Sequence, residues 1–468
     1  MEQKNVDVAI IGSGSAGLYA LGKVRPSGKS FVLINGGELG TTCARVGCMP
    51  SKALIQVAED FHRRNILGRY GVEGHKELEL DAEEAMEHVR DMRDTFVDRV
   101  LSNSTDQLSD ELFIEGYARF VDPHTLEVEG QRIRAEKIII ATGTRPILPA
   151  GWESFGDLII TTNEVFELQH LPQSLAVIGL GVVGLEIGQA MARMDVEVTG
   201  FDLLPTIGGL DDPDVAKAAI EYIGKDFSLH LGHAAEITEE GDLLRVTAGE
   251  QSVLVERVLA SLGRRPNLDN LAIENAGIQL DERGIPAFNP NTMQIGDSHI
   301  FIAGDVDGEK PILHEAGDEG RIAGYNATSD RISAFRRKVP LAINFCDPNI
   351  CYVGQRWSEL DPETTAVGEV QFSPVGRAMI MGKNRGILKV YADKQSGQLL
   401  GSEMICTKGE NLAHLLAWCI QQQLTVGQLL QFPFYHPVIE EALQAALYDC
   451  YSKVETKNDT PITELIPL

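Results

Sequence analysis

The sequence predicts an α/β protein built around two similar strand–turn–helix units. Both units carry the pattern G-x-G-x-x-G, at residues 12–17 and at residues 179–184. Each pattern ends a short apolar run and opens a helical pattern, and a second apolar run comes after each helix. A single glycine pattern is a weak signal, but the repetition of strand, turn, helix and second strand is typical of Rossmann-like dinucleotide-binding domains.

Length and charge narrow the class further. The 468 residues leave room for about three domains. Lys and Arg number 41 against 68 Asp and Glu, a net charge of −27, so the protein's field repels nucleic acids and anionic membranes. No apolar run approaches the ~18 residues of a membrane helix, and the first strand starts too close to Met1 for a signal peptide. We therefore expect a cytoplasmic protein with no nucleic-acid or membrane partner.

The first glycine turn offers a site for a dinucleotide. It comes after the apolar run at residues 6–11, and its glycines give a tight turn, a bare backbone and free helix N–H groups for a pyrophosphate. The second strand, at residues 29–35, ends in an amide where an acid usually holds the adenosine ribose; an amide can bond a hydroxyl, but without the strength of a charge-assisted bond. We expect the binding residues to be Gly12, Gly14, Ser15, Gly17 and Asn35.

Two thiols separated by four residues, Cys43 and Cys48, come soon after this strand, with Lys52 just behind them. Metal sites usually set cysteines two to four residues apart and need a second ligand pair, which this sequence lacks. A structural disulfide is the other interpretation, although such disulfides belong to small secreted domains. We predict a redox dithiol and no metal site, beside the first dinucleotide crevice.

The remaining cysteines indicate a different role. Cys346 and Cys351 repeat the four-residue gap, but they stand in an Asp-Pro turn context without a nearby Lys. The total of seven cysteines is odd and has no framework spacing, which fits mostly reduced thiols. We expect Cys346 and Cys351 to be structural, because a free cysteine usually behaves as a small buried hydrophobe.

The second unit carries the acid that the first one lacks. Its second strand, at residues 196–201, runs into Asp202, where a carboxylate can hold a ribose 2′-hydroxyl. The same carboxylate repels a 2′-phosphate and no Arg comes after it, so the sequence favours NAD over NADP. A further apolar strand, at residues 299–303, leads to Asp305, which can anchor a cofactor chain at a strand end.

A histidine near the C-terminus completes the candidate chemistry. Thiol–disulfide exchange needs a base for the attacking thiol and an acid for the leaving one, and histidine side chains in general can serve as both, which makes His436 a candidate. A carboxylate partner would orient the ring. A lone histidine is more often structural, so its role depends on the other residues of the site.

Taken in order, these motifs resemble the flavin-dependent pyridine nucleotide-disulfide oxidoreductases, which include dihydrolipoamide dehydrogenase, glutathione reductase and mercuric reductase. The match runs from about residue 6 to about residue 445. It is carried by both glycine patterns, the cysteine pair with residues 50–52, the segments 141–143, 263–267 and 303–305, and His436-Pro437.

The resemblance implies two Rossmann-like dinucleotide-binding domains and a C-terminal α+β dimerisation domain. Residues 1–150 and 276–338 would form the FAD-binding part, residues 151–275 the NAD-binding domain, and residues 339–468 the dimerisation domain. It also implies a homodimer, in which His436 and Glu441 serve the thiols of the other subunit.

The resemblance assigns a role to each site residue. Cys43 would exchange with the substrate, Cys48 would contact the flavin, and Lys52, paired with Glu186, would lie near the flavin N5. NAD would bind at Gly179, Gly181, Gly184, Asp202 and Gly263. His314 matches a position beside the flavin, with packing as its other interpretation. With the first glycine turn, the residues implied for FAD are Asn35, Thr42, Lys52, Tyr117, Ala118, Thr142, Gly143, Asp305 and His314.

The activity that this implies is oxidation of a dihydrolipoyl dithiol with reduction of NAD+, as in dihydrolipoamide dehydrogenase. The substrate would be a small dithiol or a protein-bound lipoyl group, with a 2-oxo acid dehydrogenase complex as a partner to test. Alternatives are an NAD(P)H-dependent reductase of the glutathione reductase type and a flavin-binding assembly component. Asn35, Thr41, Ala44-Arg45 and residues 438–440 depart from the family pattern near substrate or cofactor.

Overall fold

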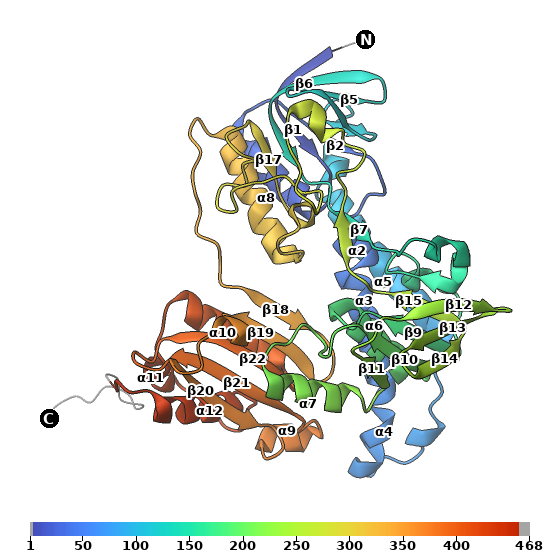
Figure 1. Cartoon of the computed structure of the whole chain (residues 1–468), viewed down its shortest axis with the longest axis vertical. Helices are drawn as coiled ribbons and strands as arrows, with labels where there is room; N and C mark the ends of the chain where they lie inside the picture. Colours follow the sequence, from blue (N-terminus) through green and yellow to red (C-terminus); the bar gives the residue numbers. More distant parts are fainter. Residues whose placement is uncertain (1–2, 458–468) are drawn as a thin grey trace.

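A computed structural model describes residues 3–457 and confirms the α/β class (Figure 1). The last eleven residues of the predicted dimerisation domain, 458–468, lie outside the described part. Figure 1 shows three groups of strands at the corners of the molecule, with the helices α2 and α3 between the first and second groups. Among the described residues, no helix is long and apolar enough to cross a membrane.

The first sheet combines segments that are far apart in the sequence. Its Val- and Ile-rich central strands are buried on both faces, as expected for parallel strands covered by helices. Helix α1 (Ser15–Val24) packs against α8 (Leu313–Thr328) on this sheet. The strand order is β3 (Phe113–Glu115), β2 (Phe31–Asn35), β1 (Gln3–Ile11), β6 (Gln131–Ile140), β5 (Thr125–Val128) and β4 (Arg119–Asp122), with β17 (Ile300–Ile302) also paired to β6.

The second sheet is parallel and belongs to the second glycine unit. Helix α6 (Val182–Arg193) comes after its glycine turn, and α7 (Pro213–Ile223) comes after its second strand. A small antiparallel sheet is attached: β12 (Glu236–Glu240), β13 (Leu243–Ala248) and β14 (Gln251–Val255). The parallel order is β11 (Ser228–Leu231), β10 (Glu197–Asp202), β9 (Ser174–Ile178), β15 (Arg257–Ala260) and β8 (Ile159–Ile160).

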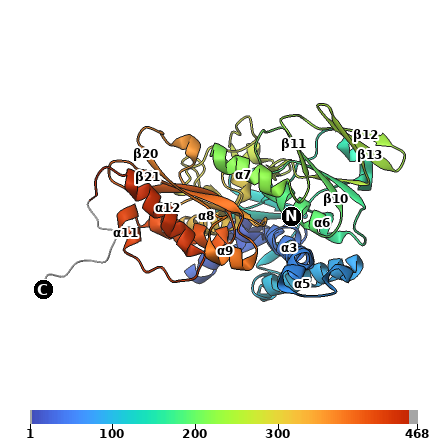
Figure 2. The ribbon, with the colours of Figure 1, turned by 90° about the horizontal axis from the view of Figure 1, so that it is seen from below.

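The C-terminal region forms an antiparallel sheet with helices packed on it, the expected α+β arrangement (Figure 2). Helix α12 (Glu440–Lys453) lies on two of its strands, and α10 (Gly409–Gln421) lies on the three others. Helix α11 (Val426–Leu430) precedes α12. The strand order is β18 (Leu341–Asn344), β19 (Asn349–Gly354), β22 (Leu399–Cys406), β21 (Gly386–Asp393) and β20 (Thr365–Gln371).

One apolar core joins the thiol-bearing segment to both later regions. Helix α2 (Thr42–Val46) leads into α3 (Cys48–His62), which packs against α5 (Ala82–Ser102) and α6. The same core cluster includes Leu54 of α3, Leu185 of α6 and Ile405 of the C-terminal sheet. Burial of such side chains contributes about 1.5–3 kcal/mol each, so α3 is held firmly at the junction.

Candidate active site

The thiol pair lies where two helices meet. Cys43 is on α2, and Cys48 is the first residue of α3; both are partly buried free thiols. Thr41 caps α2, because its Oγ1 accepts a hydrogen bond from Ala44 N at 3.2 Å. Its φ of 64° is a conformation that glycine adopts more readily, which explains why glycine is common here in the family. The side-chain cap offsets part of that strain.

The surroundings make the two sulfurs unequal. A hydrogen bond with the Cys43 side chain lowers the pKa of Cys48 to about 7, and the Lys52 ammonium acts in the same direction against burial. The same hydrogen bond, together with burial, raises the pKa of Cys43 well above its usual value. In the reduced protein, Cys48 is therefore the sulfur that carries charge near neutral pH. This asymmetry supports the expected division of roles between the two thiols.

Lys52 and Glu186 are in contact, as the resemblance implies. The Lys52 Nζ lies 2.6 Å from Glu186 Oε2, and Glu186 is only 3% exposed. The other carboxylate oxygen accepts a hydrogen bond from Phe345 N at 2.9 Å, and the Lys52 Nζ lies 4.8 Å from the centre of the Phe345 ring. Glu186 thus connects the thiol helix, the second unit and the C-terminal sheet.

The first glycine turn has the shape of a dinucleotide cradle. Gly12 has a φ of 108°, and a Cβ there would lie 2.2 Å from Ala141 O; a Cβ on Gly17 would lie 1.9 Å from Gly12 O. Gly14 has nothing within 4 Å of its Cβ position, so its side of the turn is open to a ligand. Helix α1 begins directly after it, at Ser15, with no side-chain cap on its N–H groups. A pyrophosphate fits such a turn.

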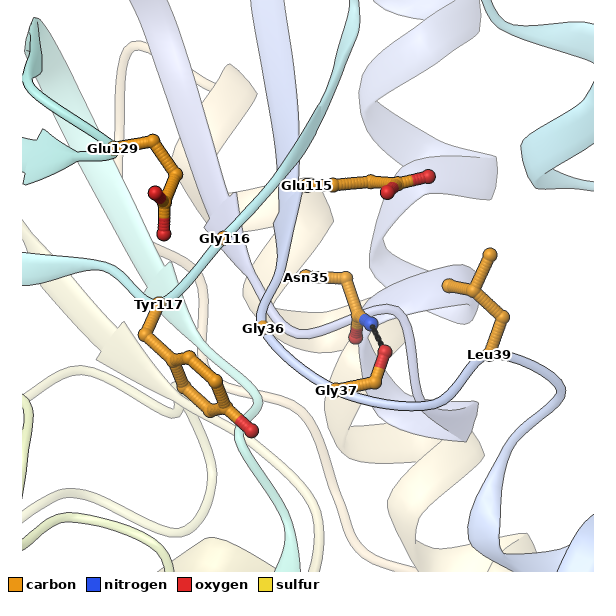
Figure 3. A pocket seen from close by; sticks show the side chains of 8 residues that line it. All are labelled: Asn35, Gly36, Gly37, Leu39, Glu115, Gly116, Tyr117 and Glu129. Carbon is orange, nitrogen blue, oxygen red and sulfur yellow. Dashed lines mark hydrogen bonds between the residues drawn. The ribbon is translucent and has the colours of Figure 1, made fainter.

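A cavity of about 390 Å³ opens at the end of β2, where the adenosine part of a dinucleotide would lie (Figure 3). The ring of Tyr117 lies over Gly36, whose bare backbone makes this approach possible: a Cβ there would be 2.5 Å from the ring. Ala118 is buried next to it in the chain. The lining residues are Asn35, Gly36, Gly37, Leu39, Glu115, Gly116, Tyr117 and Glu129.

The loop of Thr142 and Gly143 contains a buried hydroxyl group without a hydrogen-bond partner among the described residues. Within residues 3–457, the buried Thr142 Oγ1 has no hydrogen-bond partner, as expected where a ligand supplies one. Asn267 fastens this loop through bonds of 3.0 Å to both carbonyl oxygens. Asp305 accepts a bond from Thr144 Oγ1 at 3.3 Å, and burial raises the pKa of its carboxyl. These residues, with the cradle, fit FAD.

His314 has no such support. It is exposed in the first turn of α8, and burial of part of its ring lowers its pKa. Its place beside a flavin stays a prediction.

The second cradle repeats the first. Gly179 has a φ of 95°, and a Cβ added there would lie 2.4 Å from Ser261 O. A Cβ added to Gly181 would have nothing within 4 Å. Asp202 Oδ2 accepts a hydrogen bond from Leu180 N at 2.6 Å within the same turn. Gly263, with a φ of 98°, precedes the ladder that joins β16 (Arg264–Pro266) to β7 (Thr144–Pro146). This ladder connects the two units directly.

His436 has the predicted carboxylate partner. Its Nδ1 lies 2.8 Å from Glu441 Oε1, and the hydrogen bond to the imidazole lowers the pKa of Glu441. Val438 N donates to the other Glu441 oxygen at 3.1 Å. The histidine side chain is 81% exposed. Its loop lies between α11 and α12. Figure 1 places these helices apart from α2 and α3, and Figure 2 also places them apart from α3, so one chain does not bring His436 to Cys43.

Sequence reasoning missed several neighbours of these residues. Arg45, between the thiols, forms an ion pair with Glu38, and Phe345 holds Glu186 through its backbone. Glu115 and Glu129 line the cavity beside Asn35. A signal for Glu115 was present in the sequence, because it ends the strand before Gly116-Tyr117; the other contacts depend on tertiary packing.

Two dinucleotide cradles with a polarised dithiol at their junction define a two-cofactor dithiol/disulfide oxidoreductase. The chain belongs to the pyridine nucleotide-disulphide oxidoreductase family: the family model matches residues 6–320, and the model of its dimerisation domain matches residues 340–447. Members of this family use FAD and a nicotinamide dinucleotide.

Relatives carry more than one name. The chain is 31% identical to the dihydrolipoyl dehydrogenase of Haloferax volcanii over 94% of this chain and 95% of that protein. It is 28% identical to the soluble pyridine nucleotide transhydrogenase of Mycobacterium tuberculosis over 97% of this chain and 99% of that protein. The solved structure of the HOCl-induced flavoprotein disulfide reductase RclA from Escherichia coli, as a Cu(II) complex, superposes with a TM-score of 0.84 at 23% identity, covering 97% of this chain and all of the other.

Proposed function

We propose that this flavoprotein disulfide oxidoreductase oxidises a dihydrolipoyl dithiol and reduces NAD+. The observation that carries the proposal is the asymmetry of the thiols: Cys48 has a pKa of about 7, whereas that of Cys43 is raised. A reduced pair in which one sulfur is charged and the other protonated suits a relay with one end toward the substrate and one toward the cofactor.

The chain's own residues account for the thiol steps. His436 takes a proton from one substrate thiol, and the thiolate attacks the Cys43 sulfur of the Cys43–Cys48 disulfide. The second substrate thiol then displaces Cys43, so that the substrate leaves as a disulfide and both enzyme thiols are reduced. Glu441 holds the imidazole and stabilises its charged form. Bound FAD would accept the electron pair and pass it to NAD+ as hydride.

Lys52 and Cys48 prepare the charge for that transfer. The Lys52 ammonium stabilises the Cys48 thiolate, and Glu186 keeps the ammonium in place through its 2.6 Å contact. A fixed positive charge beside a developing negative one acts without reorganisation, which is why its position matters.

We propose a homodimer as the active form. His436 is exposed and lies apart from the thiols of its own chain, and the dimerisation-domain match covers residues 340–447. A second copy would then bring its His436 to Cys43. A protein-bound lipoyl group, and through it a 2-oxo acid dehydrogenase complex, would reach this shared site.

NAD+ is the proposed acceptor because of Asp202. Its carboxylate ends β10, where a ribose 2′-hydroxyl would be bound and a 2′-phosphate repelled.

The proposal is tested with the purified holoprotein in two assays: dihydrolipoamide with NAD+, and glutathione disulfide with NADPH. Turnover in the first alone supports it, and turnover in the second alone replaces it with a glutathione-type reductase. If the protein acts instead as a flavin-binding assembly component, the Cys43→Ser variant should still bind its partner although its turnover is lost.

A further inference from the structure

The end of β2 lacks an acid, but the neighbouring strand supplies one. Strands β2 and β3 run parallel, and their register places Asn35 opposite Glu115. Neighbouring parallel strands end at the same edge of a sheet, so both side chains emerge where the cofactor's ribose is usually held. Both residues line the cavity of about 390 Å³.

The Asn35 side chain is already engaged by its own turn. Its Oδ1 accepts a hydrogen bond from Ser13 N at 3.2 Å. Its Nδ2 donates to Gly37 O at 2.7 Å, and Figure 3 draws this second bond as a dashed line. An amide oxygen is uncharged, so even its free lone pair gives a weaker bond to a hydroxyl than a carboxylate does. Asn35 therefore organises the turn and is a poor anchor for the ribose.

The Glu115 carboxylate is free to serve. Among residues 3–457, no group forms a hydrogen bond or an ion pair with it. In Figure 3 its side chain extends over Asn35 and toward Leu39, whereas Glu129 lies on the opposite side, beside Gly116 and Tyr117. The apolar surfaces of Leu39 and Tyr117 suit a flat purine between these two acids.

We propose that Glu115 is the carboxylate that binds the adenosine ribose hydroxyls of FAD, in place of an acid at position 35. The second unit provides the reference. There Asp202 ends the strand itself and Leu231 is its neighbour across the ladder, so the acid and the uncharged residue have exchanged strands.

Glu129 is the other carboxylate that lines the cavity, but its backbone position does not suit it to bind the ribose. Glu129 has a φ of 46° in the turn between β5 and β6. Its Cγ would lie only 2.6 Å from a Cβ added to Gly116. It therefore packs over Gly116 and does not end a strand beside β2.

The test measures FAD binding to the flavin-free protein by quenching of flavin fluorescence, without any thiol substrate. Glu115→Gln is expected to raise the Kd for FAD about tenfold, because one charge-assisted hydrogen bond is lost. An FAD analogue without the adenosine 2′-hydroxyl should bind the wild type more weakly than FAD does, and the Glu115→Gln variant should lose most of this discrimination. Asn35→Asp in the Glu115→Gln background should restore part of the affinity.

Glu136→Gln is the matched control, since Glu136 is exposed on the same sheet but does not line the cavity. Its Kd should equal that of the wild type, and Glu129→Gln should stay within about twofold. An unchanged Kd in Glu115→Gln, equal discrimination against the analogue in both proteins, or a loss found in Glu129→Gln instead would each overturn the proposal. Failure of the dithiol assay would not affect these values, so the two proposals are judged separately.

Discussion

The two dinucleotide-binding units have the same turn but place their polar side chains differently. In both, the first glycine packs its Cα against a neighbouring carbonyl, and the residue that ends the second strand accepts a hydrogen bond from the turn: Asn35 from Ser13 N, and Asp202 from Leu180 N. The turn therefore requires only an oxygen that accepts a hydrogen bond at the end of the second strand. A negative charge on that oxygen is not needed for the turn; it would serve to bind a ribose hydroxyl of the ligand.

The units also differ in the segment after that strand. The first continues into α2 and α3 with their thiols, and the second into a loop that leads to α7. In the proposed function the first unit thus combines cofactor binding with thiol chemistry, whereas the second binds NAD+. The second unit also supplies Glu186, which contacts Lys52. The difference shows how one fold unit is adapted to two tasks by the residues that come after its second strand.

The largest expected effect separates these tasks. Cys43→Ser and Cys48→Ser should each lower dithiol–NAD+ turnover by at least about 10³-fold, because the nucleophilic relay needs both sulfurs. Binding of FAD and NADH should persist in both variants. With the flavin oxidised and no reductant added, at pH 9, Cys43→Ser should show the long-wavelength thiolate–flavin absorbance, because its Cys48 has no disulfide partner, and Cys48→Ser should lack it. Cys419→Ser, at a partly buried thiol on α10, is the control. Absorbance retained in Cys48→Ser would reverse the assignment.

Gly179→Ala should disrupt dinucleotide binding in the second unit and leave the first unit unchanged. The new Cβ would lie 2.4 Å from Ser261 O, so the turn must open. We expect the Kd for NADH to rise about 100-fold, because the backbone N–H groups lose their aim at the pyrophosphate, while bound FAD is kept. Gly22→Ala, where the added Cβ meets nothing within 4 Å, should bind both cofactors normally. Loss of FAD in Gly179→Ala would mean that the units do not act separately.

Asp202→Asn makes the second unit resemble the first. The amide oxygen can still accept the bond from Leu180 N, so the glycine turn should survive, while the bond from Leu204 N to the other oxygen is lost. The Kd for NADH should rise about tenfold through loss of a charged acceptor, with FAD content unchanged. Isothermal titration with NADH and NADPH measures both effects. Equal affinity of wild type and variant for NADH would remove Asp202 from the ribose site.

The smallest effect concerns the charge on Cys48. Its pKa is lowered to about 7, so the thiolate is present above that pH and is lost as the pH falls through it. The long-wavelength absorbance of the reduced protein should therefore be halved near pH 7. Cys43→Ala removes the hydrogen bond that contributes most, so its midpoint should move toward the usual thiol pKa. A midpoint that does not move would assign the shift to Lys52 instead.

Much of the site could be predicted because its signals are local. The glycine pattern of a strand–turn–helix unit is contained in six consecutive residues, and the thiol pair is recognisable from its own spacing and the nearby Lys52. The pairing of particular side chains was different: Lys52 with Glu186 and His436 with Glu441 were expected only through the family resemblance. The structure brings both pairs together, at 2.6 Å and 2.8 Å.

The two Rossmann-like units, the dithiol between them and the absence of an acid at position 35 can all be established from the sequence alone. Tertiary packing was needed to bring residues 300–302 back to the first sheet and to set Glu115 opposite Asn35. The reason is physical: turn and helix signals act over a few residues, whereas strand register and side-chain pairing are set by packing between segments far apart in the chain. Asn35 is a departure in the sequence alone; beside Glu115 it becomes half of a site.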